Sequence, residues 1–165
     1  MIGSGAMLLT WRRLLMVQRT AEALAALYEA DETAWLDATA ELLRAGRFDQ
    51  LDAGTLAEYL SDMARRDRRE VYSRLVVLLA HLLKWEYQAD GRPGSWRGTI
   101  LEQQRELRLL LESNTLRNHA LAVLADAYAD ARKQAAAETG LGRSTFPEVC
   151  GWDLESTLAD RSEDA

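Results

Sequence analysis

The chain has 165 residues, a length that fits one domain with a core of its own. Hydrophobic residues make up 48% of the sequence, which is typical of a globular protein and excludes a largely disordered one. The net charge of −6 argues against general DNA binding, because attraction to phosphates requires a cationic surface.

Neither an export signal nor a membrane span is expected from the sequence. The apolar run at residues 7–9 is interrupted by two arginines, so it is too short for a secretory core. The longest apolar stretch, residues 75–83, has nine residues and contains His81, whereas a spanning helix needs about 20. Cys150 is the only cysteine, which excludes an intrachain disulfide and fits a reducing compartment. We therefore expect a cytoplasmic protein.

The N-terminal third of the chain predicts a series of short helices. Residues 1–27 have apolar side chains at helical spacing and are expected to form an N-terminal helical extension. Asp31 is expected to cap a helix that ends at Gly46. Phe48 follows in a connector, where we expect it to plug the edge of the core. A further short helix is predicted over residues 53–63.

A helix over about residues 67–87 is predicted to be the centre of the fold. Val71, Leu75, Leu78 and Leu82 recur at spacings of four, three and four, and the other sides of this helix are also apolar. A helix that is apolar all round is enclosed by neighbours on several sides. The charged run at residues 65–70 is expected to form a solvated bend or first turn, with an anion site as the alternative.

The remaining sequence predicts a loop and two long helices. Residues 88–94 contain two glycines and a proline and predict the loop. Ser95 is expected to cap a helix to about residue 112, and a last long helix is expected over residues 116–139, ended by Gly140. A short helical turn is expected at residues 154–158.

The predicted fold class is all-α, because no segment alternates with the period of two that strands require. Short loops between long helices predict an antiparallel helical bundle of four to six helices around the central buried helix over residues 67–87. We expect one bundle domain over residues 28–160, between the extension over residues 1–27 and an acidic tail over residues 161–165.

Several sequence fragments together resemble a known family. The most specific are His81-Leu82-Leu83-Lys84-Trp85 and Ser95-Trp96-Arg97, the second followed by Thr99-Ile100. In their order and spacing they resemble the bacterial family catalogued as domain of unknown function twenty-nine, over about residues 28–158. The resemblance implies a compact helical protein of bacterial type. It implies no activity, cofactor or catalytic residue.

Three side chains on the central helix are the candidate catalytic residues. Arg74, His81 and Lys84 share one side of an ideal helix. The Arg-x6-His spacing is also seen in helical-bundle ribonucleases of the HEPN type. A histidine can transfer a proton near neutral pH, and an arginine can hold phosphate oxygens. The alternative, which we favour, is a histidine bonded to a neighbouring helix and an arginine paired with a carboxylate.

No metal site and no cofactor are expected. Carboxylates four residues apart occur at positions 58 and 62, 102 and 106, and 126 and 130. A ferritin-like site also requires a Glu-x-x-His pattern on two helices, which this sequence lacks. We expect each pair to face solvent or to meet an arginine.

Two functions remain as hypotheses. The favoured one is a non-enzymatic helical interaction module with a protein partner, either a second copy or another protein, and with a homo-oligomer as one form. The N-terminal segment and the alanine-rich last helix are its candidate surfaces. The alternative is a HEPN-like ribonuclease that uses Arg74 and His81, and RNA is a partner only under this alternative.

Overall fold

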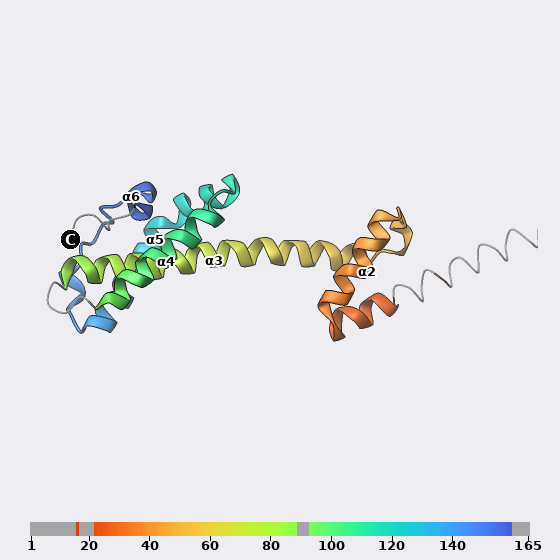
Figure 1. Ribbon diagram of the computed structural model, residues 1–165, viewed down its shortest axis with the longest axis horizontal. Coiled ribbons are helices and arrows are strands. Elements are labelled where there is room, and N and C mark those ends of the chain that lie inside the picture. Colours follow the sequence, from red (N-terminus) through yellow and green to blue (C-terminus); the bar gives the residue numbers. More distant parts are fainter. Residues whose placement is uncertain (1–15, 17–21, 89–92, 160–165) are drawn as a thin grey trace, which may run out of the picture. The chain divides into compact units, whose positions relative to one another are not determined.

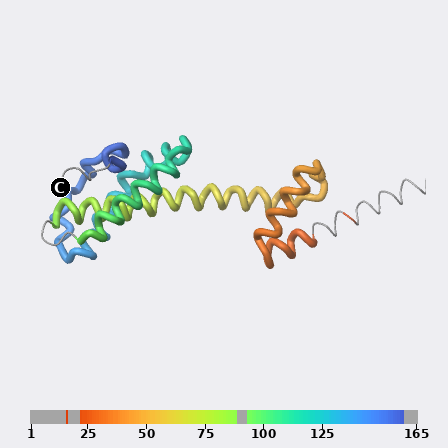
Figure 2. Tube along the Cα trace, viewed as in Figure 1, coloured from red at the N-terminus to blue at the C-terminus, as the bar shows by residue number. Residues whose placement is uncertain are grey.

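The computed structural model describes Met16 and residues 22–88 and 93–159 (Figures 1 and 2). Every regular element in these ranges is helical, which confirms the predicted all-α bundle. The chain divides into two compact units, Met1–Ser61 and Asp62–Ala165. The predicted extension and acidic tail lie outside the described residues, apart from Met16 and residues 22–27. The single domain expected over residues 28–160 stays a prediction.

The N-terminal unit contains a helix over residues 22–30, α2 (Glu32–Arg44), the 3-10 turn η1 (Phe48–Gln50) and the start of α3 (Ala53–Tyr87). Asp31 caps α2 as predicted, since its Oδ1 accepts a hydrogen bond from the Ala34 amide at 3.0 Å. Gly46 follows α2 with φ +66°, a left-handed conformation that favours glycine.

Trp35 is the centre of the N-terminal core. It is 2% exposed and packs with buried Leu24 and Leu42. The rings of Tyr28 and Tyr59 meet the Trp35 ring edge-on, at centroid distances of 5.0 and 5.1 Å. These contacts join α2 to the helices before and after it.

The prediction that Phe48 plugs the edge of this core is wrong. Phe48 is 67% exposed. Leu51 packs against the core instead, three residues later, after the η1 turn. The Phe48 ring is therefore left on the surface of the N-terminal unit.

Helix α3 runs unbroken over Ala53–Tyr87, so the two separate helices expected over residues 53–63 and 67–87 are wrong. The charged run between them continues the helix. Ion pairs join Asp62 to Arg65 and Glu70 to Arg74, at spacings of three and four residues. Such pairs support an exposed helix, and no proline or glycine interrupts this stretch.

The second part of α3 is the core helix of the C-terminal unit, as predicted. Its buried residues begin at Val71 and extend to Lys84, with several at 0% exposure. Two neighbouring rows of side chains at helical spacing account for this burial. The first row consists of Val71, Leu75, Leu78 and Leu82, and the second of Leu79 and Leu83.

Helices α4 (Gly94–Leu110) and α5 (Asn114–Thr139) pack along α3 (Figure 1). Arg74 of α3 bonds Gln103 of α4, while Lys84 lies over the ring of Trp96. From the first contact to the second, the residue number rises in α3 and falls in α4. The two helices are therefore antiparallel. The helix expected to start at Trp96 after a Ser95 cap begins two residues earlier, at Gly94, with Pro93 as the cap residue. The Trp96 amide already donates to the Pro93 carbonyl at 3.0 Å.

Alanines let α5 approach its neighbours closely. Ala120, Ala127, Ala131 and Ala135 are all 0% exposed. Gly140 ends the helix with φ +73°, as predicted. The chain then passes through the turn η2 (Arg143–Thr145) to α6 (Leu154–Leu158).

Gln104 holds α6 against α4. This side chain is 0% exposed, and its Nε2 donates to the carbonyls of Thr157 at 3.2 Å and Ala159 at 2.7 Å. Buried Leu154 and Leu158 add apolar contact. The short C-terminal helix is therefore part of the core.

We predict that Leu75→Ala lowers the free energy of unfolding by about 2–5 kcal/mol, because it opens a cavity in the packed centre of the unit. Leu109→Ala is the matched control, since Leu109 is 57% exposed and its truncation costs within about 0.5 kcal/mol. Urea denaturation followed by circular dichroism measures both. Equal effects of the two substitutions would contradict the central position of α3.

Candidate functional site

Lys84 is the most unusual of the candidate residues, because it is a lysine with 2% exposure. Its Nζ donates to Oε2 of Glu138 on α5. The same ammonium lies 4.9 Å from the centre of the Trp96 ring on α4. A buried ammonium is costly unless it is paired. Lys84 meets this requirement with a carboxylate from one helix and an aromatic face from another.

His81 lies one turn before Lys84 and is half-buried. Its Nδ1 is 2.8 Å from the Val77 carbonyl, which can only accept, so Nδ1 carries the proton. Nε2 is then free to accept from the Lys84 ammonium at 3.2 Å. Burial lowers the pKa of His81 most, and the positive charge of Lys84 lowers it further. The arrangement therefore holds a neutral imidazole.

Glu138 completes the group. Its side chain is 40% exposed, so the carboxylate lies where the buried ammonium reaches the surface. Burial alone would raise the pKa of Glu138, but hydrogen bonds from Lys84 and Gln134 outweigh it and hold that pKa below its usual value. The carboxylate is therefore ionised at neutral pH and balances the charge of Lys84.

Arg74, the third candidate, has a different set of partners. Its Nε donates to Glu70 Oε1 at 2.9 Å, and its Nη1 donates to Gln103 at 3.2 Å. A second carboxylate, that of Glu106, lies 3.8 Å from Nη2. Arg74 and His81 share no partner among the described residues, although they share a side of α3.

These contacts favour a structural role for the three candidate residues. For His81 to accept a proton from a substrate, Nε2 would have to release Lys84. For Arg74 to hold a phosphate, it would have to leave two carboxylates. Physically, the group acts as a polar brace that joins α3 to α4 and α5. We call Lys84, His81, Glu138 and Trp96 the Lys84 brace.

Sequence reasoning missed two long-range polar contacts. One is the pairing of Lys84 with Glu138, which lie 54 residues apart. The other is the hydrogen bond from the Tyr72 hydroxyl to Asp130 Oδ2 at 2.6 Å, which raises the pKa of Tyr72 to about 12. Asp130 also accepts from Lys133, and its side chain is 44% exposed.

Cys150 is half-buried, and its thiol donates to the Trp152 carbonyl at 3.2 Å. Burial raises the pKa of this thiol. A raised pKa reduces the thiolate that would act as a nucleophile or a metal ligand. Neither role is therefore favoured for Cys150.

In the described part of the chain, no group of three or more histidine, cysteine, aspartate or glutamate side chains is placed to hold a metal ion. None of the helices in that part combines the length and apolarity that crossing a bilayer requires.

Together, the fold and the brace define a small all-α protein with a buried, charge-balanced lysine in its C-terminal unit. The chain belongs to the family described as Domain of unknown function DUF29, whose family model matches residues 27–162. The family predicted from the His81–Trp85 and Ser95–Arg97 fragments is thereby confirmed. Searches of curated proteins and of solved structures found no match.

We predict that Glu138→Gln destabilises the protein more than Lys84→Met does. The first change leaves a buried ammonium without its carboxylate, whereas the second leaves a partly exposed carboxylate that water can solvate. We expect about 2–3 kcal/mol for Glu138→Gln and about 1 kcal/mol for Lys84→Met in urea denaturation. The reverse order would show that Lys84 is not held by Glu138.

A second prediction concerns pH. The pKa of His81 is lowered in the folded state, so the unfolded chain binds the proton more readily below pH 6.5. Stability that is complete above pH 6.5 is therefore lost as the pH falls through the lowered pKa. His81→Gln, which retains an acceptor for Lys84, should flatten this loss when unfolding is measured between pH 7 and about pH 5. An unchanged slope would mean that His81 charges as easily in the fold as outside it.

Proposed function

We propose that the protein is a non-enzymatic helical interaction module, and that the surface of its N-terminal unit binds a second copy of the chain. The observation that carries the proposal is the exposure of large apolar side chains on this small unit. Phe48 is 67% exposed, Leu60 57% and Leu43 42%. Covering a side chain of this size is worth about 1.5–3 kcal/mol.

The size of the N-terminal core also supports a partner. Its buried apolar side chains in the described residues are Leu24, Trp35 and Leu42. Units with so little core are usually stabilised by disulfides, metals or oligomerisation. The only cysteine of the chain, Cys150, lies in the other unit, so a disulfide within this unit is excluded. Association with a second copy would cover Phe48, and twofold dimers are the commonest form of self-association.

The Lys84 brace supports the non-enzymatic part of the proposal. Lys84 and Arg74 each meet a carboxylate, and the neutral imidazole of His81 is bonded at both nitrogens. The set that the ribonuclease hypothesis requires is thus engaged: His81 contacts residues of its own helix, and Arg74 contacts Glu70 of α3 and Gln103 of α4. A reducing cytoplasm suits a chain with one cysteine, and we propose that location.

Self-association should depend on Phe48. We expect the full chain to sediment as a concentration-dependent dimer, and Phe48→Ser or Leu60→Gln to weaken the dimer by about tenfold or more, because each removes buried apolar contact. Analytical ultracentrifugation measures the dissociation constant. Val149→Ser is the matched control, because Val149 is 78% exposed but lies in the C-terminal unit.

Two results would overturn the proposal. One is a chain that stays monomeric over the whole concentration range, or a dimer that Val149→Ser weakens as much as Phe48→Ser. The other is hydrolysis of RNA by the purified chain that is lost in His81→Ala while the circular dichroism spectrum is retained. The second result would establish the ribonuclease in place of a non-enzymatic module.

A further inference from the structure

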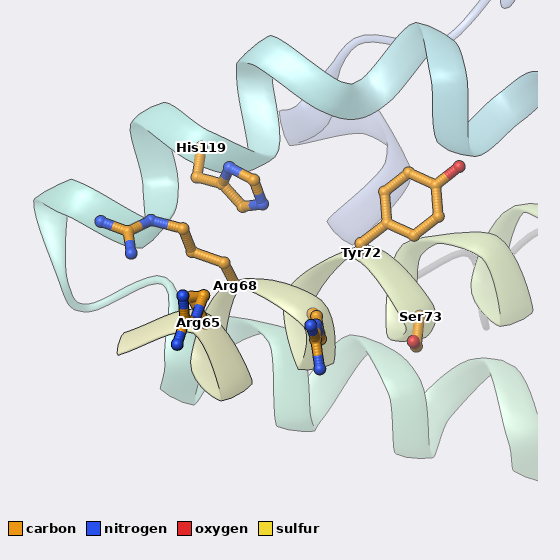
Figure 3. Close-up of a pocket in the computed structure, with 6 residues that line it drawn as sticks. Arg65, Arg68, Tyr72, Ser73 and His119 are labelled. Atoms are coloured by element: carbon orange, nitrogen blue, oxygen red, sulfur yellow. The ribbon is translucent and has the colours of Figure 1, made fainter. Parts of the chain in front are cut away.

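A basic pocket lies between α3 and α5 in the C-terminal unit, away from the Lys84 brace. It has a volume of about 550 Å³ and is open to solvent. Its lining consists of Arg65, Arg68, Arg69, Tyr72, Ser73 and His119. Figure 3 shows His119 on α5 facing Arg68 on α3, with the ring of Tyr72 further along the same space. We infer that this pocket binds an organic phosphate of nucleotide size.

The arginines of the pocket retain donors for an anion. The pocket lining contains three guanidinium groups and no carboxylate. Arg68 donates to the Ala64 carbonyl, a contact that leaves its charge unpaired. Arg69 has no ion pair with any residue in the described ranges, whereas Arg65 pairs with exposed Asp62. Arginines that line one pocket with no carboxylate in its lining are suited to phosphate, which guanidinium groups bind through charge-assisted hydrogen bonds.

The two ends of the pocket differ in charge, and this difference would orient a bound ligand. Tyr72 is one helical turn beyond Arg68, about 6 Å along the axis. Its hydroxyl donates to Asp130, so a carboxylate, which Lys133 also contacts, lies beyond that end of the pocket. A phosphate is therefore favoured at the arginine end, beside His119, and disfavoured near Tyr72.

The ring of Tyr72 is then available for a flat group. Its hydroxyl donates to Asp130 and fixes the ring, which lines the pocket. Stacking of a base on an aromatic side chain is a common source of affinity. The volume of the pocket lies within the range of small-molecule sites, about 300–1,000 Å³, and is larger than a phosphate ion needs. A phosphate joined to a flat ring would place the phosphate beside the arginines and the ring against Tyr72.

The test is calorimetric titration of the full chain with adenosine monophosphate, adenosine and inorganic phosphate. We expect the monophosphate to bind more tightly than either part alone. Arg68→Gln and Arg69→Gln should each weaken it by about tenfold or more. Arg66→Gln is the matched control, because Arg66 is the neighbouring arginine on α3 but does not line the pocket. It should leave the affinity within about twofold.

Tyr72 has its own pair of variants. Tyr72→Phe keeps the ring and Tyr72→Leu removes it, while both lose the hydrogen bond to Asp130. We expect Tyr72→Phe to keep the preference for adenosine monophosphate over inorganic phosphate, and Tyr72→Leu to lose it. Circular dichroism checks the fold of each variant.

The inference is overturned if adenosine binds as tightly as its monophosphate, or if inorganic phosphate does. Absence of binding by all three compounds overturns it as well. So does an equal loss of affinity in Arg66→Gln and Arg68→Gln, which would indicate attraction to the general charge of α3. These outcomes do not depend on self-association, which involves residues of the other unit.

Discussion

Burial of α3 between Val71 and Lys84 is the constraint on which the C-terminal unit depends. This stretch has apolar side chains on more sides than one neighbour can cover, so α4, α5 and α6 must all pack with it. The alanines of α5 are the complement of these leucines, because small side chains let the helix approach. The other parts of the unit follow from this packing.

A charged group at the end of such a helix needs a specific partner. Lys84 is buried by the same packing that buries the leucines, and the cost of its charge is offset by Glu138 and the Trp96 ring. This pairing fixes the helices relative to one another more narrowly than apolar contact alone, because an ammonium and a carboxylate must meet at one position. The hydrogen bonds through which His81 and Lys84 stabilise the fold also engage the atoms that would otherwise contact a substrate. At the other end of the unit, where burial stops, Arg65, Arg68 and Arg69 of α3 line an open pocket.

Much of the fold could be predicted because periodicity and capping are local. Asp31, Gly46 and Gly140 mark helix ends in the sequence, and each does so in the structure. The continuity of α3 could not be predicted, because the charged run at residues 65–70 has the composition of a bend and is held helical by pairs along the helix. The partner of Lys84 could not be predicted either, since the sequence has 26 acidic residues and does not say which one lies nearby. The same holds for the pocket, which needs His119 from α5 beside arginines of α3.

Native-state hydrogen exchange along α3 is the most direct test of this account. If burial of residues 71–84 organises the C-terminal unit, their amide protons exchange slowest, with free energies of opening close to that of global unfolding. The amides of residues 53–61, at the start of the same helix, should exchange orders of magnitude faster, since they rest on a small core. Equal protection along the whole helix, or faster exchange in residues 71–84, would contradict the account.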